Sequence, residues 1–531
     1  MDLPRRVSAR LLAAHRALLA LPAAVLLAGL GCVALAISSD LANSLDVPRG
    51  GGPLAALATC AALVLAFAAF TLATRDRLPR WLSSSIPIAL RRHAPLTRWL
   101  VYPLLLWAAF TTIQTGGILA RGAVTAATVS PPRYGSDDLY YNQYNAWLVL
   151  HGQNPYVGEH LAAEVRFFGA TDYTPIARGR FADVRHYPTR AQMDAVVAEY
   201  LAHPQAPPLE LDARTTHSYP AGAFLVNVPA VALGLPSIAL PQIALFLALI
   251  AAIVWATPPP YRAVVALLAL ATADGARQVA GSDFEIWPLA LVGFAWLARD
   301  RRWLSAILLG LACTTKQTAW LAAAFYLVWV WRTDGLAEVG RRAGIAVGAF
   351  LVVNLPWIIM APGAWLSSLL LPVSLPLLPD GSGLVGLSLA GALPLMPSWV
   401  YGLLELAGLA AALVWYWRAA RRMPYAGLVL PLAPLLLAWR SSERYFVLLP
   451  LAGLLALALA DRYHAEQRIT SAASFTSSLV ASHWRFRSPF MRRPFMAAIR
   501  HADTEGRRSG EHCSRPAPTN TGVRDAPLCD D

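Results

Sequence analysis

Charged residues are scarce in this chain, at 14% of its 531 residues, against roughly 25% in a typical soluble domain. Hydrophobic residues make up 56%. Long apolar runs recur between Ala17 and Ala460, and a helix needs about 20 apolar residues to cross the hydrocarbon core of a membrane. The composition excludes an ordinary soluble protein and predicts an all-α, polytopic transmembrane protein.

Lysine is almost absent, because Lys316 is the only one among 44 basic residues and all the others are arginines. The arginines cluster in short loops between apolar runs and in a tail after Gln467, as the positive-inside rule describes. No stripe combines basic and aromatic residues into a surface on which bases would stack. The net charge of +13 therefore predicts a membrane orientation, with membrane lipids and no nucleic acid as partners.

Paired cysteines are also absent, because the five cysteines are scattered and form no Cys-x-x-Cys motif. Histidines do not cluster near them either. This spacing indicates neither a disulfide framework nor a zinc site. We expect no metal and no cofactor.

Apolar runs divide the chain into candidate spans, and we expect about 11–13 crossings from their length. Four of the runs lie between residues 218 and 298, where the flanking arginines require an odd number of crossings. One of these four is therefore short, broken or re-entrant, and the 14-residue run 261–274 is the first choice. The candidate spans are 17–37, 53–73, 99–120, 218–234, 237–257, 261–274, 284–298, 303–312, 318–331, 343–360, 399–418, 425–439 and 445–460.

Arginine counts predict the orientation and three regions. Four arginines precede the first run and six lie in the loop 74–98, so the N-terminus is expected in the cytoplasm. Residues 1–98 then form a two-span region with a basic cytoplasmic loop, and 99–460 form the main transmembrane module. Its loop 122–217 faces outward and carries interfacial helices. Residues 465–531 are expected to be a basic, disordered cytoplasmic tail, by composition.

The outward loop opens with a predicted helix over 137–150, because its apolar and aromatic residues follow a helical spacing. Asp137 and Asp138 lie at its first turn, where carboxylates interact favourably with the helix dipole. One interpretation is an ordinary acidic cap on an amphipathic interfacial helix. The other is that one carboxylate serves as a general base at the membrane edge.

The stretch "CTTKQTAW" places Lys316 and Gln317 between two short apolar runs. With both flanks in the cytoplasm, these residues lie at the outer tip of the pair and line a polar cavity open to the outside. An ionisable residue at such a place suggests function. The alternative is a lysine that only extends its ammonium to the membrane surface.

Several other polar residues fall in outward segments. Arg440 and Arg444 lie in "WRSSERY", where Arg444 has an alternative role as a partner of Glu443. His217 precedes Tyr219 at the start of an apolar run and has interfacial packing as its alternative role. The stretch "RQVAGSDFE" contains Gln278 and Asp283. Asp283 and the nearby Glu285 have capping of the following helix as their alternative role.

Taken in order, these motifs resemble the GT-C superfamily of membrane glycosyltransferases. Within it, the chain is most similar to the bacterial family 87-like group, which is polyprenyl-phosphate-mannose-dependent and α-1,2-mannosyltransferase-like. The resemblance covers roughly residues 100–460. It departs from the family at "RQVAGSDFE", where a Gly-Gln-x-Asn-like turn is expected, and this bears on the acceptor. The matching motifs are the acid pair followed by Tyr140 and Tyr141, "GQNPY" at 152–156, "YP" at 219–220, "GLACTTKQTAW", "NLPW" at 354–357, "PDGSGLVGLSL" at 379–389 and "RSSERYF" at 440–446.

The resemblance implies a multi-pass bacterial plasma-membrane enzyme with cytoplasmic termini and an extracytoplasmic active site. It would move a hexose, mannose by preference, from a polyprenyl-phosphate donor to a lipid or polysaccharide acceptor with inversion. Asp137 would be the base and Asp138 the runner-up. Cations would stabilise the departing phosphate. The implied phosphate ligands are Lys316, Gln317, Arg444 and Arg440, and the possible substrate contacts are Tyr141, His217, Tyr219, Gln278 and Asp283.

Three other classes remain open at this point, and one of them, a purely structural membrane scaffold, would not need Lys316. A transporter or flippase of lipid-linked sugars would also bind such a donor, but transporters usually contain internal repeats with paired broken helices. No convincing repeat is present, and the long outer loop fits an enzyme better. A polymerase or ligase of surface polysaccharide would use the same class of donor.

Overall fold

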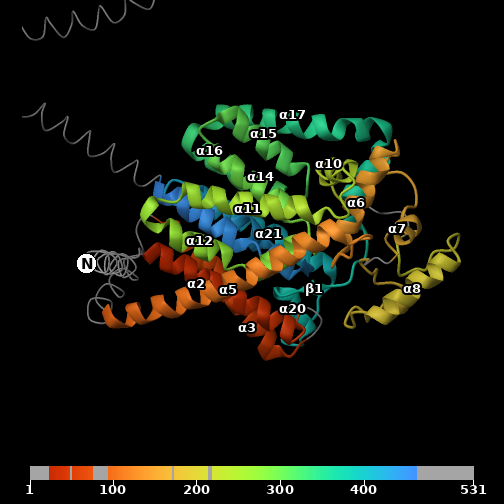
Figure 1. The fold of residues 1–531 in the computed structure, drawn as a ribbon, viewed down its shortest axis with the longest axis horizontal. Coiled ribbons are helices and arrows are strands. Elements are labelled where there is room, and N and C mark those ends of the chain that lie inside the picture. Colours follow the sequence, from red (N-terminus) through yellow and green to blue (C-terminus); the bar gives the residue numbers. More distant parts are fainter. Residues whose placement is uncertain (1–22, 48–50, 76–93, 170–172, 213–217, 463–531) are drawn as a thin grey trace, which may run out of the picture. The chain divides into compact units, whose positions relative to one another are not determined.

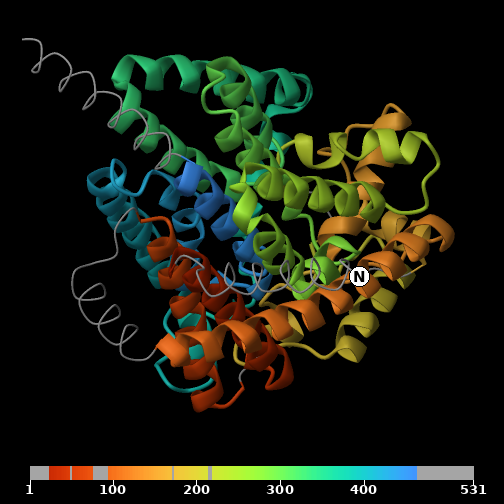
Figure 2. The same cartoon turned by 60° about the vertical axis from the view of Figure 1, so that its left-hand side comes forward.

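The computed structural model describes residues 23–47, 51–75, 94–169, 173–212 and 218–462. This part of the chain is mostly helical, which confirms the all-α class. Figure 1 shows the helices in chain order, and Figure 2 shows them turned by 60°. In both views the N-terminal helices α2 (Ala23–Ser44) and α3 (Pro53–Ala73) lie on the opposite side of the bundle from α17 (Leu336–Met360). The predicted tail 465–531 lies outside the described residues.

Seven helices in the described part are long and apolar enough to cross a membrane. They are α2, α3, Val101–Thr128 of α5 (Ala94–Thr128), α11 (Ala239–Ala256), α17, α21 (Ser398–Ala419) and the segment Glu443–Arg462. Shorter apolar helices lie between them: η3 (Pro259–Tyr261) with α12 (Arg262–Leu270), α14 (Ile286–Leu297) and α15 (Arg302–Cys313). α16 (Thr318–Asp334) completes the predicted pair of short arms around Lys316.

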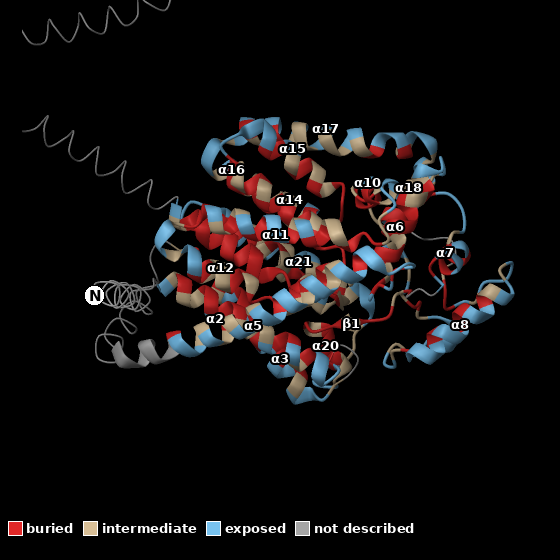
Figure 3. Cartoon of the chain, in the orientation of Figure 1, coloured by how far each residue is buried: buried red, intermediate tan, exposed pale blue. Residues whose placement is uncertain are grey.

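Burial divides the long helices into two kinds. The segment Glu443–Arg462 has 83% of its apolar window buried, whereas the windows of α17 and α21 have 11% and 6% buried. Figure 3 shows these exposed positions along α17, and buried ones gathered around α11 and α12. Apolar helix surfaces without protein neighbours are what a lipid environment covers. The structure thus supports a membrane protein whose last described helix lies at its centre.

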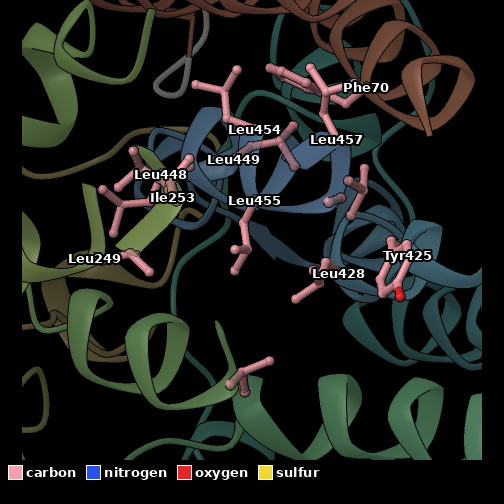
Figure 4. Packing of buried hydrophobic residues seen from close by; sticks show 14 of the residues in the cluster. Phe70, Leu249, Ile253, Tyr425, Leu428, Leu448, Leu449, Leu454, Leu455 and Leu457 are labelled. Atoms are coloured by element: carbon pink, nitrogen blue, oxygen red, sulfur yellow. The ribbon is translucent and has the colours of Figure 1, made fainter. Parts of the chain in front are cut away.

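The central helix, 449–462, packs on all sides against other elements. Leu449, Leu454, Leu455 and Leu457 are at most 1% exposed, and Figure 4 shows them between Phe70 of α3 and residues of α11. Gly453 permits the close approach to α3, because a Cβ there would lie 2.2 Å from Phe70 Cδ1. Small residues at such crossings allow helix backbones to approach in membranes.

A buried ion network lies at one end of α16 and α17. Arg342, only 2% exposed, contacts Glu338 at 3.0 Å and Asp334 at 3.1 Å and donates to the carbonyl oxygen of Arg299 at 3.1 Å. Tyr326 of α16 accepts a further bond from the guanidinium at 2.5 Å. A buried charge is tolerated when its donors are satisfied in this way. The network links α17 to the end of α16 and to the connection after α14. It lies at the opposite end of α16 from Lys316.

The loop 122–217, which was predicted to face outward, contains helices, as predicted. It contains α6 (Asp137–Leu150), α7 (Leu161–Phe168), η2 (Gly179–Phe181) and α8 (Arg190–Ala202). Side chains of α7 and α8 share a small hydrophobic core with Leu378. Ser136 caps α6, because its side chain accepts a hydrogen bond from the Asp138 backbone N–H at 3.2 Å. The predicted bounds 137–150 of this helix are confirmed.

Three predicted spans differ from the structure. The first described helix continues to Ser44 instead of ending at 37, and α5 continues to Thr128 instead of ending at 120. The run 425–439 forms two 3₁₀ helices, η4 (Pro424–Leu428) and η5 (Leu430–Leu437). Prolines there remove backbone donors and prevent a continuous α-helix.

The run 218–234 is broken into two short helices, α9 (Gly222–Leu225) and α10 (Val228–Ala232). Residues near both ends of this run contact the region at the start of α6. The Tyr219 hydroxyl donates to Asp138, and the hydroxyl oxygen of Tyr134 lies 2.9 Å from that of Ser237. The run 218–234 is therefore interrupted, and the predicted run 261–274 is short as well, because its helix α12 ends at Leu270 and α13 begins at Ala273.

Two motifs far apart in the sequence meet in a short parallel pairing. β1 (Asp380–Gly381) pairs with β2 (Arg440–Ser441), with Asp380 opposite Arg440. Gly381 has φ +139°, and a Cβ there would lie 2.1 Å from the carbonyl oxygen of Ser441, so only glycine fits. The remaining helices α13 (Ala273–Val279), α18 (Pro362–Leu369), α19 (Leu371–Ser374), α20 (Leu384–Leu389) and η6 (Glu443–Tyr445) connect the longer elements around this pairing.

Candidate active site

Lys316 lies at the centre of the polar cluster that the structure brings together. Its ammonium contacts Asp138 at 2.7 Å, Glu285 at 2.8 Å and Asp283 at 3.4 Å. It also lies 4.8 Å from the ring centre of Tyr219. Lys316 is 5% exposed; burial lowers its pKa, but the three carboxylates outweigh this and hold the pKa well above its usual range. Lys316 is therefore a buried cation paired with carboxylates, and not a side chain extended into solvent.

Two of the three contacts are hydrogen bonds, to Asp138 and Asp283, and the contact with Glu285 is an ion pair. A phosphate approaching Lys316 would be repelled by the three carboxylates around it. The geometry thus favours an organising role for Lys316 over its predicted role as a direct phosphate ligand.

The two adjacent aspartates of α6 have different surroundings. Asp138 is 9% exposed, bonds to Lys316 and accepts a hydrogen bond from the hydroxyl of Tyr219. Burial alone would raise its pKa, but the charge of Lys316 and these hydrogen bonds bring it to about 2. Asp138 is therefore a poor proton acceptor at neutral pH, because a general base works best with a pKa near the operating pH.

Asp137 is half-buried and has no ion pair among the described residues. Thr174 donates to its Oδ2 at 2.5 Å, and its Oδ1 accepts the Asp138 backbone N–H at 3.0 Å. Burial and the charge of Asp138 raise its pKa, against the opposing effects of Thr174 and the guanidinium groups of Arg444 and Arg440. Of the two predicted candidates, Asp137 is thus the better base.

Arg440 and Arg444 both interact electrostatically with Asp137, from a separate segment of the chain. The β1–β2 pairing holds Arg440, which is half-buried and makes no hydrogen bond or ion pair within the described residues. Arg444 is exposed and donates from Nη2 to the carbonyl oxygen of Gly135 at 3.3 Å. The predicted alternative, pairing of Arg444 with Glu443, is not among the ion pairs of the described residues. Both guanidinium groups retain donors for an anion.

Asp283 and Glu285 lie in the turn before α14 and combine structural and electrostatic roles. Asp283 Oδ1 accepts the backbone N–H of Phe284 at 2.6 Å, while Glu285 Oε2 accepts from Thr318 at 3.2 Å. Burial and the neighbouring carboxylates raise the pKa of Asp283 to about 7, although Lys316 opposes the shift. Both residues contact Lys316. The predicted alternative, capping of α14, did not suggest these contacts. Sequence reasoning therefore gave Glu285 too small a role.

The remaining predicted residues lie in different surroundings. Gln317 donates to the carbonyl oxygens of Ser218 at 2.6 Å and Leu369 at 3.3 Å, so it anchors backbone and does not point to an anion. Tyr141 is half-buried, and burial followed by the charge of Asp137 raises its pKa well above its usual range. His217 lies outside the described residues. Gln278 is buried and donates from Nε2 to the carbonyl oxygen of Arg444 at 2.8 Å.

A polar cavity of about 540 Å³ adjoins this cluster. Gly135, Gln278 and Arg444 belong to its wall, together with residues from the end of α2. Sequence reasoning missed the contribution of α2, because nothing in the pattern of an apolar span indicates what its last turn contacts.

Within the described residues, no group of three His, Cys, Asp or Glu is arranged to hold a metal ion. No family model, curated protein or solved structure gives a significant match to this chain. Any assignment of function therefore rests on the residues of the site.

Proposed function

We propose that the chain is an inverting membrane glycosyltransferase that uses a polyprenyl-phosphate sugar, with mannose the favoured sugar by resemblance to the GT-C superfamily. The observation that carries the proposal is that the two neighbouring aspartates have different charged partners. Asp138 is neutralised by Lys316, while Asp137 stays unpaired opposite two arginines with spare donors. A base and a pair of cations that interact with it electrostatically are what transfer from a phosphate donor requires.

In the proposed reaction, Asp137 takes the proton of an acceptor hydroxyl as its oxygen attacks the anomeric carbon of the donor sugar. A new carbon–oxygen bond forms while the bond to the phosphate oxygen breaks. The electron pair of that bond leaves with the polyprenyl phosphate, where Arg440 and Arg444 stabilise the growing negative charge. One carboxylate is sufficient, because a single in-line displacement inverts the sugar without a covalent intermediate.

Lys316 has an organising role in this proposal. By pairing with Asp138, Asp283 and Glu285 it joins α6 to the connections that precede α14 and α16. The position of Asp137 then depends on Lys316 through the first turn of α6. Gln317 supports the same arrangement by anchoring residues 218 and 369.

The proposed topology has twelve crossings with both ends of the described chain in the cytoplasm. The broken run 218–234 does not cross, because both its ends meet the start of α6. α11, α12 and α14 then supply the odd number of crossings that the arginines require. This arrangement puts Asp137, Lys316 and Arg440 on the extracytoplasmic side, and single cysteines at 183 and 421 should be labelled from opposite faces of sealed vesicles.

The decisive experiment compares Asp137→Asn with wild type in nanodiscs supplied with polyprenyl-phosphate mannose and a glycolipid extract. Product masses should show transfer by wild type and a loss of at least about 100-fold in the variant, the lower end of what a general base contributes. Asp194→Asn is the matched control, because Asp194 is an exposed carboxylate of the same outer loop. Full transfer by Asp137→Asn would remove the proposed base.

The pH dependence of transfer gives a second test of the same assignment. Asp137 must be ionised to act, and its pKa is raised above its usual value. The rate should therefore rise as the pH increases through that raised pKa and then level off. A transporter or flippase would instead move the lipid-linked sugar across the vesicle membrane without any new glycosidic bond.

A further inference from the structure

We infer that the polar cavity beside the arginines binds an uncharged saccharide, the sugar end of the acceptor, through hydrogen bonds. The acceptor part of this inference rests on the proposed transferase function, whereas saccharide binding does not. The cavity measures about 540 Å³, within the range of about 300–1,000 Å³ usual for small-molecule sites. Ten of its twelve lining residues are polar or charged, and none is aromatic.

Two buried oxygen atoms in residues of the cavity wall accept no hydrogen bond within the described part of the chain. They are Gln278 Oε1 and Glu443 Oε2. Gln278 is 5% exposed, so bulk water does not solvate its amide freely. Leaving a buried acceptor unpaired costs about 1–3 kcal/mol. Because each atom has almost no solvent-accessible surface, either side chain must rotate to accept a hydrogen bond from a hydroxyl in the cavity.

The charges of the wall favour an uncharged ligand over an anion. Asp40, Asp274 and Glu443 face Arg277 and Arg444. Arg277 is already paired with Asp274, which leaves two carboxylates and one guanidinium for a ligand. Carboxylates accept hydrogen bonds from hydroxyls, and arginine donates to ring and hydroxyl oxygens. An anionic sugar such as a uronic acid would be repelled by the surplus carboxylate inside the cavity.

The end of α2 supplies further polar groups at this wall. Ser39, Asn43 and Ser44 line the cavity, and the Asn43 amide donates to the carbonyl oxygen of Ser39 at 3.0 Å. These side chains belong to a helix instead of a flexible loop. A site built on rigid elements holds its polar groups in place before the ligand arrives.

Hydrogen bonds connect the cavity to the proposed catalytic residues. Gln278 donates to the backbone of Arg444, and Arg444 donates to Gly135. Gly135 precedes Asp137 by two residues and itself lines the cavity. A saccharide in this cavity therefore lies beside the segment that carries the base.

The test measures binding of methyl α-D-mannopyranoside and methyl α-D-glucopyranoside to the full chain by saturation-transfer NMR. Nanodiscs replace maltoside detergents, which would themselves present sugars. Ser44→Trp should fill the rim and weaken binding by about tenfold or more, which corresponds to about 1.4 kcal/mol. Leu45→Trp is the matched control, because Leu45 is the next residue, is exposed and does not line the cavity.

Asn43→Leu provides a second, smaller change in the cavity wall. Sodium glucuronate provides an anionic probe, which should bind more weakly than the two uncharged sugars. Absence of saturation transfer with wild type, or equal binding by Ser44→Trp and wild type, would overturn the inference. Saccharide binding without any transfer activity would leave the site standing and reject the transferase. Transfer with an unchanged KM for the saccharide in Ser44→Trp would show that the acceptor binds elsewhere.

Discussion

Replacing Lys316 by methionine removes a buried cation from three carboxylates while keeping a side chain of similar length. Lys316 and its partner side chains are at most 12% exposed, so solvent screens them little. Breaking a buried ion pair by removing one partner typically costs about 3–5 kcal/mol. Asp138 alone accounts for about 2 kcal/mol of this at neutral pH, because its pKa is about 2 instead of 3.8 and each unit is worth about 1.36 kcal/mol.

The pH dependence of this destabilisation follows from the sign of the shifts. In wild type, the depressed pKa of Asp138 contributes stability above pH 3.8 that is lost as the pH falls toward 2. Without Lys316, burial and the repulsion between Asp138 and Asp283 raise the pKa values of these two carboxyl groups. Lys316→Met should therefore become more stable as the pH falls from 7.5 to 5, and its deficit relative to wild type should shrink.

The assay is unfolding by sodium dodecyl sulfate in mixed micelles, followed by tryptophan fluorescence at pH 7.5 and pH 5.0. Arg190→Met is the matched control, because Arg190 pairs with Asp194 at 3.0 Å but both are more than half exposed, so its loss should cost under about 1 kcal/mol. Adding Asp283→Asn to Lys316→Met should restore part of the lost stability. A Lys316→Met protein as stable as this control at pH 7.5 would refute the reasoning.

Three further outcomes are expected from the geometry. Tyr219→Phe should cost about 1–2 kcal/mol in the same titration, because it removes a hydrogen bond to the buried carboxylate of α6; an unchanged midpoint would contradict this. Gly453→Val should cost about 1–3 kcal/mol by overpacking against Phe70, whereas Gly402→Val, where a Cβ meets open space, should cost under about 1 kcal/mol; equal costs would exclude the close crossing. Arg444→Met should raise the KM for the polyprenyl-phosphate donor, and an unchanged KM would remove this residue from the phosphate site.

The helix content of the fold was largely predictable from the sequence, because apolar runs long enough to span a membrane have no soluble alternative. The helix 137–150 was predicted to the residue, since its apolar and aromatic residues follow a helical spacing behind an acidic first turn. The interruption of 218–234 was not predicted. Its composition is as apolar as a true span, and only contacts of Tyr219 and Ser237 with the α6 region reveal that the chain turns back.

The residues of the candidate site were predictable from the sequence, but the ion pairs and hydrogen bonds between them were not. Lys316 meets Asp138 across 178 residues and Asp283 across 33, and no local pattern specifies such partners. The sequence therefore suggested that Lys316 binds phosphate directly, whereas in the structure three carboxylates already surround its ammonium. For the same reason Thr174 and the end of α2 were missed, because each acquires its place only through distant contacts.

The burial of the segment Glu443–Arg462 has a consequence for biosynthesis. Translation runs from the N-terminus, so every element that surrounds this segment leaves the ribosome before it does. Helices such as α3 and α11, which pack against this segment, are therefore synthesised before their partner is present. A ribosome stalled before residue 443 would thus expose an unfinished bundle to membrane quality control, and the step that completes the core is also the one that delivers Arg444 beside Gly135.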